Sequence, residues 1–411
     1  RAIFSAHRAV AWRRRRSGGI SGWPLRTTRT QAFLTAHKPS ICSAQLMKKK
    51  VVLLTQADFW TRSYGLAARV FELVRFLAPR FDLSIALLGN LTENDLRMMR
   101  EMRLDFNLYV LGESVPVQLS QQAQAQRLLE NFRHYFNESS PPATYIVVKT
   151  EYSFMLEGVP ANGKTMLDTN DLISARTKSM QQHNAPAHFP LTEGEELEIF
   201  RRYDSVICIQ PVEYAWVCAR LGAEKTILAQ HPIAAKRTIL RKTVASIGIV
   251  ASRWHANVDG LNWFIERVWP HFQGRNLTLD VYGMVCQELS RREIPGMQMH
   301  GFMEYIDACY AHIDIAINPV RYGAGLKIKS VEAMAWGLPL VASVQGASGL
   351  EELAGQAFLL ARDEREFIAA IESMLQNIEL RRSIGRAACA YVAEHLSAER
   401  CFGELAKHIV A

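Results

Sequence analysis

Short apolar runs alternate with amphipathic segments along the chain from residue 51 onward. Runs of five or six residues this apolar are typical of strands buried on both faces of a parallel sheet, and in the first part they cover residues 51–55, 83–88, 106–111, 144–149, 164–168, 205–209 and 225–229. Between the first two runs, Leu66, Val70 and Leu77 fall on one helical face, and Arg69 and Glu72 fall on the other. This spacing predicts an amphipathic crossover helix, and therefore a βαβ unit with a parallel sheet.

A polar, basic stretch at residues 231–245 interrupts this alternation, and we interpret it as an interdomain linker. After it, the pattern predicts strands at 246–252, 277–283, 297–302, 313–320 and 339–343, and helices at 257–272, 305–312, 363–377, 379–395 and 397–409. We expect an α/β protein with two doubly wound, Rossmann-like domains facing a central cleft, at residues 47–230 and 246–395. A C-terminal helix within 396–411 is expected to pack back on the first domain.

The net charge of +8 comes from one end of the chain. Residues 1–46 hold eight Arg and one Lys without any Asp or Glu, so the remainder has 39 basic and 40 acidic residues. A nucleic-acid partner therefore has no electrostatic support in the body of the protein. The basic tail is interpreted as disordered, as a targeting segment or as non-native translated sequence before Met47.

The cysteine content and the hydropathy pattern argue against two further classes, disulfide-rich proteins and proteins that span a membrane. Seven cysteines without a CxxC pair favour a reducing compartment and argue against a disulfide framework or a zinc site. No apolar run reaches the 18 or so residues that a membrane span needs.

Residues 321–339, RYGAGLKIKSVEAMAWGLP, carry the chemistry that is easiest to interpret. They follow an expected buried strand, and open α/β sheets bind ligands beyond the carboxyl ends of their strands. Gly323 and Gly325 allow close approach of backbone, and a helix N-terminus directly after them favours an anion. Lys327 adds a positive charge suited to a phosphate oxygen, and Glu332 can accept hydrogen bonds from two vicinal hydroxyls. Taken singly, such a glycine pair is usually a turn, and such a lysine or glutamate is usually solvated.

This stretch, continued as LVASVQGASGL, closely resembles the donor-binding signature of group 1, or family 4, glycosyltransferases, which are retaining enzymes of the GT-B fold. HANVDGLNWFIERVWP resembles their helix after the linker, and MHGFMEYIDACYAHIDIAINPVRYGAG looks like the segments that flank the nucleotide base. The resemblance is specific over residues 246–350, weaker over 51–230 and absent from 1–46.

The resemblance implies roles in binding a nucleotide-sugar donor. Glu332 would hold the ribose, Lys327 and Arg253 the diphosphate, and the backbone around Gly301 and Phe302 would line the base. Catalysis would rest on these two cations, which neutralise the leaving group.

Two positions depart from the family pattern, and both lie where the resemblance puts the donor sugar. Ala324 stands where many members have a second glutamate, and Asn170 where a histidine often faces the sugar. Asn170 can form hydrogen bonds but cannot be a general base. Asn170 or Asp171 could equally cap a helix, and Arg62 and Gly65 are assigned to a flexible loop near donor and acceptor, with a plain turn as the alternative.

We therefore expect a cytoplasmic retaining, hexosyltransferase-like enzyme. It would move a sugar from a nucleoside-diphosphate sugar to a glycan or lipid-linked hydroxyl in surface polysaccharide or glycoconjugate synthesis, without a cofactor or metal. The alternative is a non-catalytic GT-B subunit that binds a partner or nucleotide. A dinucleotide oxidoreductase is disfavoured because no G-x-G-x-x-G follows the first strand. Arg97, Arg100 and Arg103 leave peripheral contact with the inner face of a membrane open, although their mixture with acidic residues favours a solvated helix face.

Overall fold

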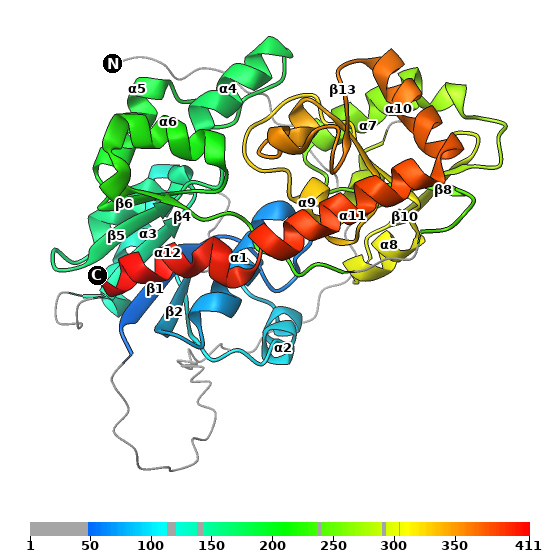
Figure 1. Cartoon of the computed structure of the whole chain (residues 1–411). Helices are drawn as coiled ribbons and strands as arrows, with labels where there is room; N and C mark the ends of the chain where they lie inside the picture. The colour runs from blue at the N-terminus through cyan, green and yellow to red at the C-terminus, as the bar shows by residue number, and fades with distance from the viewer. Residues whose placement is uncertain (1–47, 113–120, 138–142, 237–239, 290–292, 304) are drawn as a thin grey trace, which may run out of the picture. The chain divides into compact units, whose positions relative to one another are not determined.

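Two parallel sheets organise the computed structural model, which describes residues 48–112, 121–137, 143–236, 240–289, 293–303 and 305–411 (Figure 1). The strand order is β3-β2-β1-β4-β5-β6-β7 in the first sheet and β10-β9-β8-β11-β12-β13 in the second. Each order changes direction once, between β1 and β4 and between β8 and β11, and such a switch point is where open α/β sheets bind ligands. The hypotheses for residues 1–46 lie outside the described residues.

The first sheet is buried on both faces, as the apolar runs predict. In its central strand, Val51 and Leu53 belong to one buried cluster and Val52 and Leu54 to the cluster on the opposite face. The strands of this sheet are β1 (Lys50–Thr55), β2 (Asp82–Leu87), β3 (Asn107–Val110), β4 (Ala143–Val148), β5 (Lys164–Asp168), β6 (Ser205–Cys208) and β7 (Thr226–Leu228). The helices between them are α1 (Gly65–Leu77), α2 (Glu93–Glu101), α3 (Gln121–Tyr135), α4 (Ile173–Gln182), α5 (Glu193–Arg201) and α6 (Pro211–Leu221), with a 3-10 helix at Thr150–Gly158.

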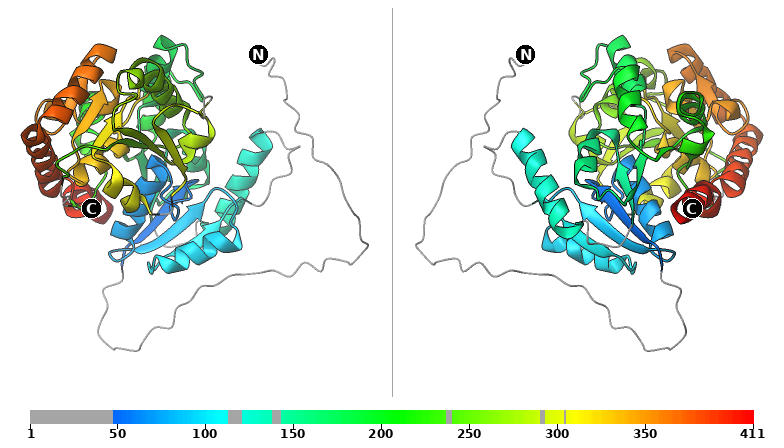
Figure 2. Two further views of the ribbon diagram at one scale, coloured as in Figure 1. Left: turned by 90° about the vertical axis from the view of Figure 1, so that its right-hand side faces the viewer. Right: turned by 90° about the vertical axis from the view of Figure 1, so that its left-hand side faces the viewer.

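The second sheet repeats this plan, with helices on both faces (Figures 1 and 2). Its strands are β8 (Ser246–Val250), β9 (Thr278–Tyr282), β10 (Met297–Gly301), β11 (Ile315–Asn318), β12 (Leu340–Ser343) and β13 (Leu359–Ala361). Its helices are α7 (His255–Arg267), α8 (Ile306–His312), α9 (Ile328–Ala335), α10 (Glu364–Gln376) and α11 (Ile378–His395). Strand β13 was not predicted, although β7, which is equally short, was.

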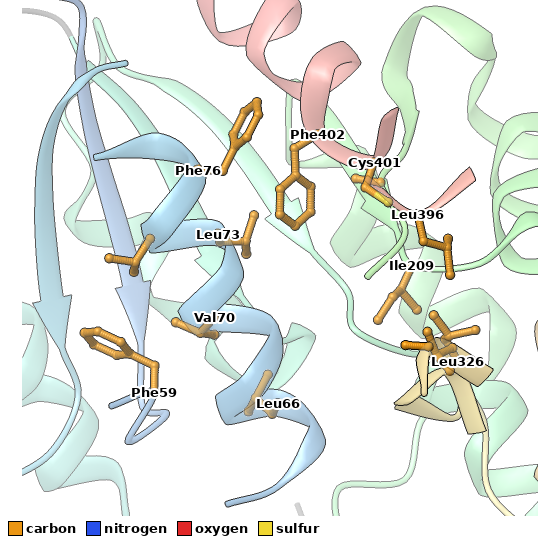
Figure 3. Close-up of a cluster of buried hydrophobic side chains, with 14 of the residues drawn as sticks. Phe59, Leu66, Val70, Leu73, Phe76, Ile209, Leu326, Leu396, Cys401 and Phe402 are labelled. Carbon is orange, nitrogen blue, oxygen red and sulfur yellow. The ribbon is translucent and has the colours of Figure 1, made fainter. Parts of the chain in front are cut away.

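Helix α12 (Ala398–Val410) follows α11 and packs on α1 and β7. Phe402 of α12 meets Phe76 of α1 edge to face, with ring centroids 5.4 Å apart. Figure 3 shows the buried cluster around this contact, which also includes Leu326 and Ile209. The C-terminal residues thus close the outer face of α1.

Arg69 lies on the polar face expected for this amphipathic helix but does not face solvent, because α12 covers α1. Arg69 is fully buried, and its guanidinium forms an ion pair of 2.8 Å with Asp168 at the end of β5, whose side chain is also fully buried. Arg69 Nε donates a second hydrogen bond of 2.8 Å to the same carboxylate. A helix that looks amphipathic in sequence is therefore covered on both sides here, and the buried charge is paired.

The methionines of α2 do not form an exposed edge. Met99 is buried, and Met98 and Met102 pack against the core, while a capping box of Thr92 and Asp95 begins the helix. In the described part of the chain, no helix is long and apolar enough to cross a bilayer.

Candidate functional site

The segment between β11 and α9, residues 321–327, forms a tight loop that we call the glycine loop. Gly323 has φ of 126° and Gly325 has φ of 74°, a backbone region that residues with a side chain rarely adopt. A Cβ atom on Gly323 would lie 2.6 Å from the Trp254 ring, and one on Gly325 would lie 2.8 Å from the backbone oxygen of Asn170. The glycines are therefore required both by backbone conformation and by close packing.

Lys327 is the last residue of the glycine loop and directly precedes α9. Its Nζ donates hydrogen bonds to the backbone oxygens of Ala324 (2.7 Å) and Gly325 (2.8 Å), and the side chain is buried. Burial lowers the pKa of the Lys327 ammonium to about 8, although the charges of Glu213, Asp171 and Glu351 favour its protonated form. The Lys327 ammonium is thus only partly stabilised by the protein's own carboxylates. Because it also lies at a helix N-terminus, it is suited to bind an anionic ligand.

Glu332 lies one turn further along α9 in a half-buried position. Its Oε2 accepts a hydrogen bond of 2.9 Å from the Tyr310 hydroxyl of α8. Burial raises the pKa of the Glu332 carboxyl to about 7, while Tyr310 and Lys329 favour the charged form. Burial also lowers the pKa of Lys329 to about 7, and the neighbouring Lys327 contributes to this shift.

Two side chains of the first domain accept hydrogen bonds from backbone N–H groups of the glycine loop. Gly323 N donates to Ser179 Oγ of α4 at 3.0 Å, and Gly325 N donates to Glu213 Oε1 of α6 at 2.9 Å. Neither Ser179 nor Glu213 was predicted as a site residue. Glu213 follows Pro211 at the start of a helix, a position where acidic residues are common for local reasons, so no sequence signal marks it.

Asn170 and Asp171 approach the loop from the end of β5. Asn170 has φ of 62°, a left-handed conformation that asparagine tolerates better than most residues. Asp171 is buried and forms an ion pair of 2.9 Å with Arg176. The capping alternative for these two residues is wrong, because Glu196 instead accepts hydrogen bonds from the first N–H groups of α4, those of Ile173 and Ser174.

The remaining donor-side candidates are less enclosed. Arg253 is exposed, has no hydrogen bond or ion pair within the described residues, and precedes Trp254, whose ring covers Gly323. Gly301 ends β10 with φ of 71° and open space where a Cβ would stand, and Phe302 after it is 50% exposed. Ala324 contributes only its backbone oxygen, which accepts from Lys327 as described above. Among the described residues, no hydrogen bond or ion pair joins Gly301 or Phe302 to the glycine loop.

Gly65 brings the start of α1 to the start of α9. A Cβ on Gly65 would lie 3.3 Å from the Ile328 side chain, and neither helix has a side-chain cap at its N-terminus. Two positive helix ends therefore meet beside the loop. Arg62, three residues earlier, is exposed and lies 4.7 Å from the centroid of the Phe71 ring, with φ of 49°.

Comparison with protein families matches residues 245–377 to the model described as glycosyl transferases group 1. The matched segment is about a third of the chain, and it contains the glycine loop and Glu332. A protein described as an uncharacterized 44.6 kDa protein in the cps region of Klebsiella pneumoniae is 24% identical over 163 residues, which are 37% of this chain and 42% of that protein. The match thus spans less than half the length of this curated relative.

Solved glycosyltransferases share the fold of the whole described chain. Sucrose-phosphate synthase from Thermosynechococcus elongatus has a TM-score of 0.66 at 14% identity, covering 88% of this chain and 99% of its own. HepE from Anabaena, in complex with UDP and glucose, has a TM-score of 0.65 at 12% identity over 88% and 99% of the two chains. TarM from S. aureus, in complex with fondaparinux, α-GlcNAc-glycerol and UDP, has a TM-score of 0.68 at 9% identity over 88% and 100%. The expected GT-B fold is confirmed, and identities this low show the fold alone.

Proposed function

We propose that the protein is a retaining glycosyltransferase that moves a sugar from a nucleoside-diphosphate sugar to a hydroxyl of a glycan or lipid-linked acceptor. The observation that carries this proposal is the pairing of a buried cation at the start of α9 with a half-buried carboxyl within this helix. Lys327 lies at its N-terminus beside a second helix N-terminus, and Glu332 lies a turn later against Tyr310. This spacing suits a ligand with a diphosphate at one end and vicinal ribose hydroxyls next to it.

The mechanism we propose uses the leaving group as the base. The bond between the anomeric carbon and the diphosphate oxygen breaks, and the acceptor oxygen forms a new bond on the same face of the sugar. The acceptor proton passes to an oxygen of the departing diphosphate. The contribution of this chain is to neutralise the developing charge, through Lys327, Arg253 and the helix N-terminus, and to position Asn170 and Asp171 beside the glycine loop.

The wider role that we propose is the synthesis of a surface polysaccharide or glycoconjugate from cytoplasmic nucleotide sugars. Support comes from the relative in the cps region of K. pneumoniae and from the nucleotide and glycan ligands of HepE and TarM. No contact within the described residues selects the acceptor.

The first test is a thermal-shift panel of UDP, GDP, ADP, CMP and NAD against the full chain. A ligand that binds the native state raises Tm, by the equivalent of about 2.7 kcal/mol at a concentration of one hundred times Kd. We expect one nucleoside diphosphate to raise Tm in the wild type but not in Glu332→Ala. Glu394→Ala removes an exposed glutamate of α11 and should keep the full shift.

The result that would overturn the proposal is equally specific. If no nucleotide raises Tm, or if Glu332→Ala keeps the shift, then α9 does not bind a donor. The protein would then be better described as a non-catalytic GT-B subunit.

A further inference from the structure

Glu213 places a carboxyl group directly against the loop that is proposed to bind the donor diphosphate. Its Oε1 accepts hydrogen bonds from Gly325 N (2.9 Å) and from Gln210 Nε2 (3.0 Å). Its Oε2 is buried and has no hydrogen-bond partner within the described residues. The side chain as a whole is only 4% exposed. One oxygen is thus engaged by the loop, and the other has unused capacity to form a hydrogen bond.

The charges around Glu213 are balanced rather than strongly positive. Lys327 faces it from the glycine loop, while Asp171 faces it from the end of β5 and the Cys208 thiol from β6. Asp171 is itself paired with Arg176, and Glu351 also faces Lys327. Burial, together with the Asp171 charge, raises the pKa of the Glu213 carboxyl to about 7.

A diphosphate at the glycine loop conflicts with a carboxylate in this position. Two anions that share one buried N–H group and one cation repel each other strongly at low dielectric. A protonated carboxyl removes the repulsion, and its hydroxyl becomes a hydrogen-bond donor for a phosphate oxygen. Since Oε2 has no partner, it is the atom that could carry this proton.

We propose that Glu213 meets the donor diphosphate as a neutral carboxylic acid, so that donor binding is coupled to the uptake of one proton. This inference rests on the proposed function and assigns Glu213 as a positioning residue of the same site. Gly325 N and the Glu213 hydroxyl would then hold the diphosphate from two domains. The proton would have to be released again when the nucleotide leaves at high pH.

Isothermal titration with UDP-glucose provides the first test, because this diphosphate diester does not itself titrate near neutral pH. If only the protonated form of Glu213 binds, a pKa of about 7 makes wild-type affinity about four-fold weaker at pH 7.5 than at pH 6.0. Glu213→Gln carries a neutral amide donor and should bind at least as tightly as the wild type at pH 7.5. Glu196→Gln is the matched control, because Glu196 is also buried with a raised pKa but accepts hydrogen bonds from the first N–H groups of α4 and not from the glycine loop. This control should keep the wild-type pH dependence.

Infrared difference spectroscopy decides which group takes up the proton, since Lys327 titrates in a nearby range. At pH 7.5, binding of UDP-glucose to the wild type should produce the C=O stretch of a carboxylic acid, which a carboxylate lacks. The band should be absent in Glu213→Gln and present in Glu196→Gln. The pKa of Glu332 is also raised to about 7, so the band is assigned to Glu213 by its loss in Glu213→Gln and its persistence in Glu332→Gln. If Glu213→Gln does not fold, a wild type that binds without the band still overturns the inference.

Three outcomes would overturn the inference. They are a wild type that binds UDP-glucose without the band, a Glu213→Gln variant that keeps the band, and a Glu213→Gln variant that binds more weakly than the wild type at both pH values. In each case, binding that Glu332→Ala abolishes would leave the proposed function intact. If UDP-glucose, GDP-mannose and ADP-glucose all fail to bind the wild type, both the inference and the proposed function are refuted.

Discussion

Substitution of Gly325 by alanine tests the packing of the glycine loop, and Gly301 provides a matched control. The two glycines have nearly the same backbone conformation, with φ of 74° and 71°. They differ in their surroundings, because a Cβ on Gly325 would meet the Asn170 backbone oxygen at 2.8 Å and Asp171 Cβ at 2.9 Å, whereas a Cβ on Gly301 would meet nothing within 4 Å. Any difference between the two variants therefore reports the neighbours and not the backbone angle.

The expected magnitudes follow from these two terms. Placing alanine in the left-handed region costs about 1–2 kcal/mol at either site. Gly325→Ala adds an overpacking term of about 1–3 kcal/mol, because the atoms that it meets include backbone and cannot rotate away. The loop could avoid this clash only by moving away from the first domain. That movement would break the hydrogen bond from Gly325 N to Glu213 and would therefore also lower the stability of the protein.

Thermal unfolding followed by circular dichroism measures the difference. The overpacking term corresponds to a Tm that is roughly 2–12 °C lower for Gly325→Ala than for Gly301→Ala, at about 2–4 °C per kcal/mol for domains of 150–250 residues. Equal Tm values, or a larger loss in Gly301→Ala, would refute the contact between the loop and residues 170–171. Such a result would also contradict the packing of the loop against the first domain, on which the hydrogen bond from Gly325 N to Glu213 depends.

Three further predictions concern buried charges. Arg69→Met and Asp168→Asn should each lower the free energy of unfolding by about 3–5 kcal/mol, because each change leaves the partner charge buried and unpaired. The double variant should lose less than the sum of the two single losses. Additive losses, measured by urea unfolding, would contradict a coupled pair. The pKa of Glu332 is raised in the folded protein to about 7, so the stability that this group contributes is complete below its unfolded value near 4.5 and is lost as pH rises to about 7. Glu332→Gln should therefore raise Tm more at pH 8 than at pH 5, and the reverse order would contradict the burial. Finally, Lys327→Ala should lower kcat/KM for transfer more than it weakens binding of a free nucleoside, whereas equal losses would show only ground-state binding.

The sequence predicted those parts of the structure that depend on local periodicity. Runs such as VVLL at residues 51–54 and IGIV at residues 247–250 are apolar at every position, and they became the central strands β1 and β8 because strands buried on both faces require such runs. The glycine loop was also predicted from local sequence, because two glycines between an expected buried strand and a helix N-terminus allow close approach of backbone. The burial of Arg69 was not predicted, because its helix is covered by α12, which lies more than 300 residues later in the chain.

The same distinction separates the residues of the candidate site. Lys327 and Glu332 are close in sequence to the glycines that identify the loop, so local reasoning reaches them. Glu213 is 112 residues from Gly325, and its hydrogen bond depends on how the two domains meet. A glutamate in the first turn of a helix is explained by its favourable interaction with the helix dipole, so the sequence gives no reason to assign Glu213 a further role.

This arrangement also limits where binding energy for a donor can come from. Since Gly325 N already donates to Glu213, and Gly323 N to Ser179, a phosphate that takes their place exchanges one acceptor for another. Such an exchange contributes little to the net free energy of binding, because hydrogen bonds are lost as well as formed. The favourable difference must then come from charge, through Lys327 and the two helix N-termini at Gly65 and Ile328. Affinity for a nucleoside diphosphate should accordingly depend more on Lys327 than on the loop N–H groups, although the glycines are the more obvious feature of the sequence.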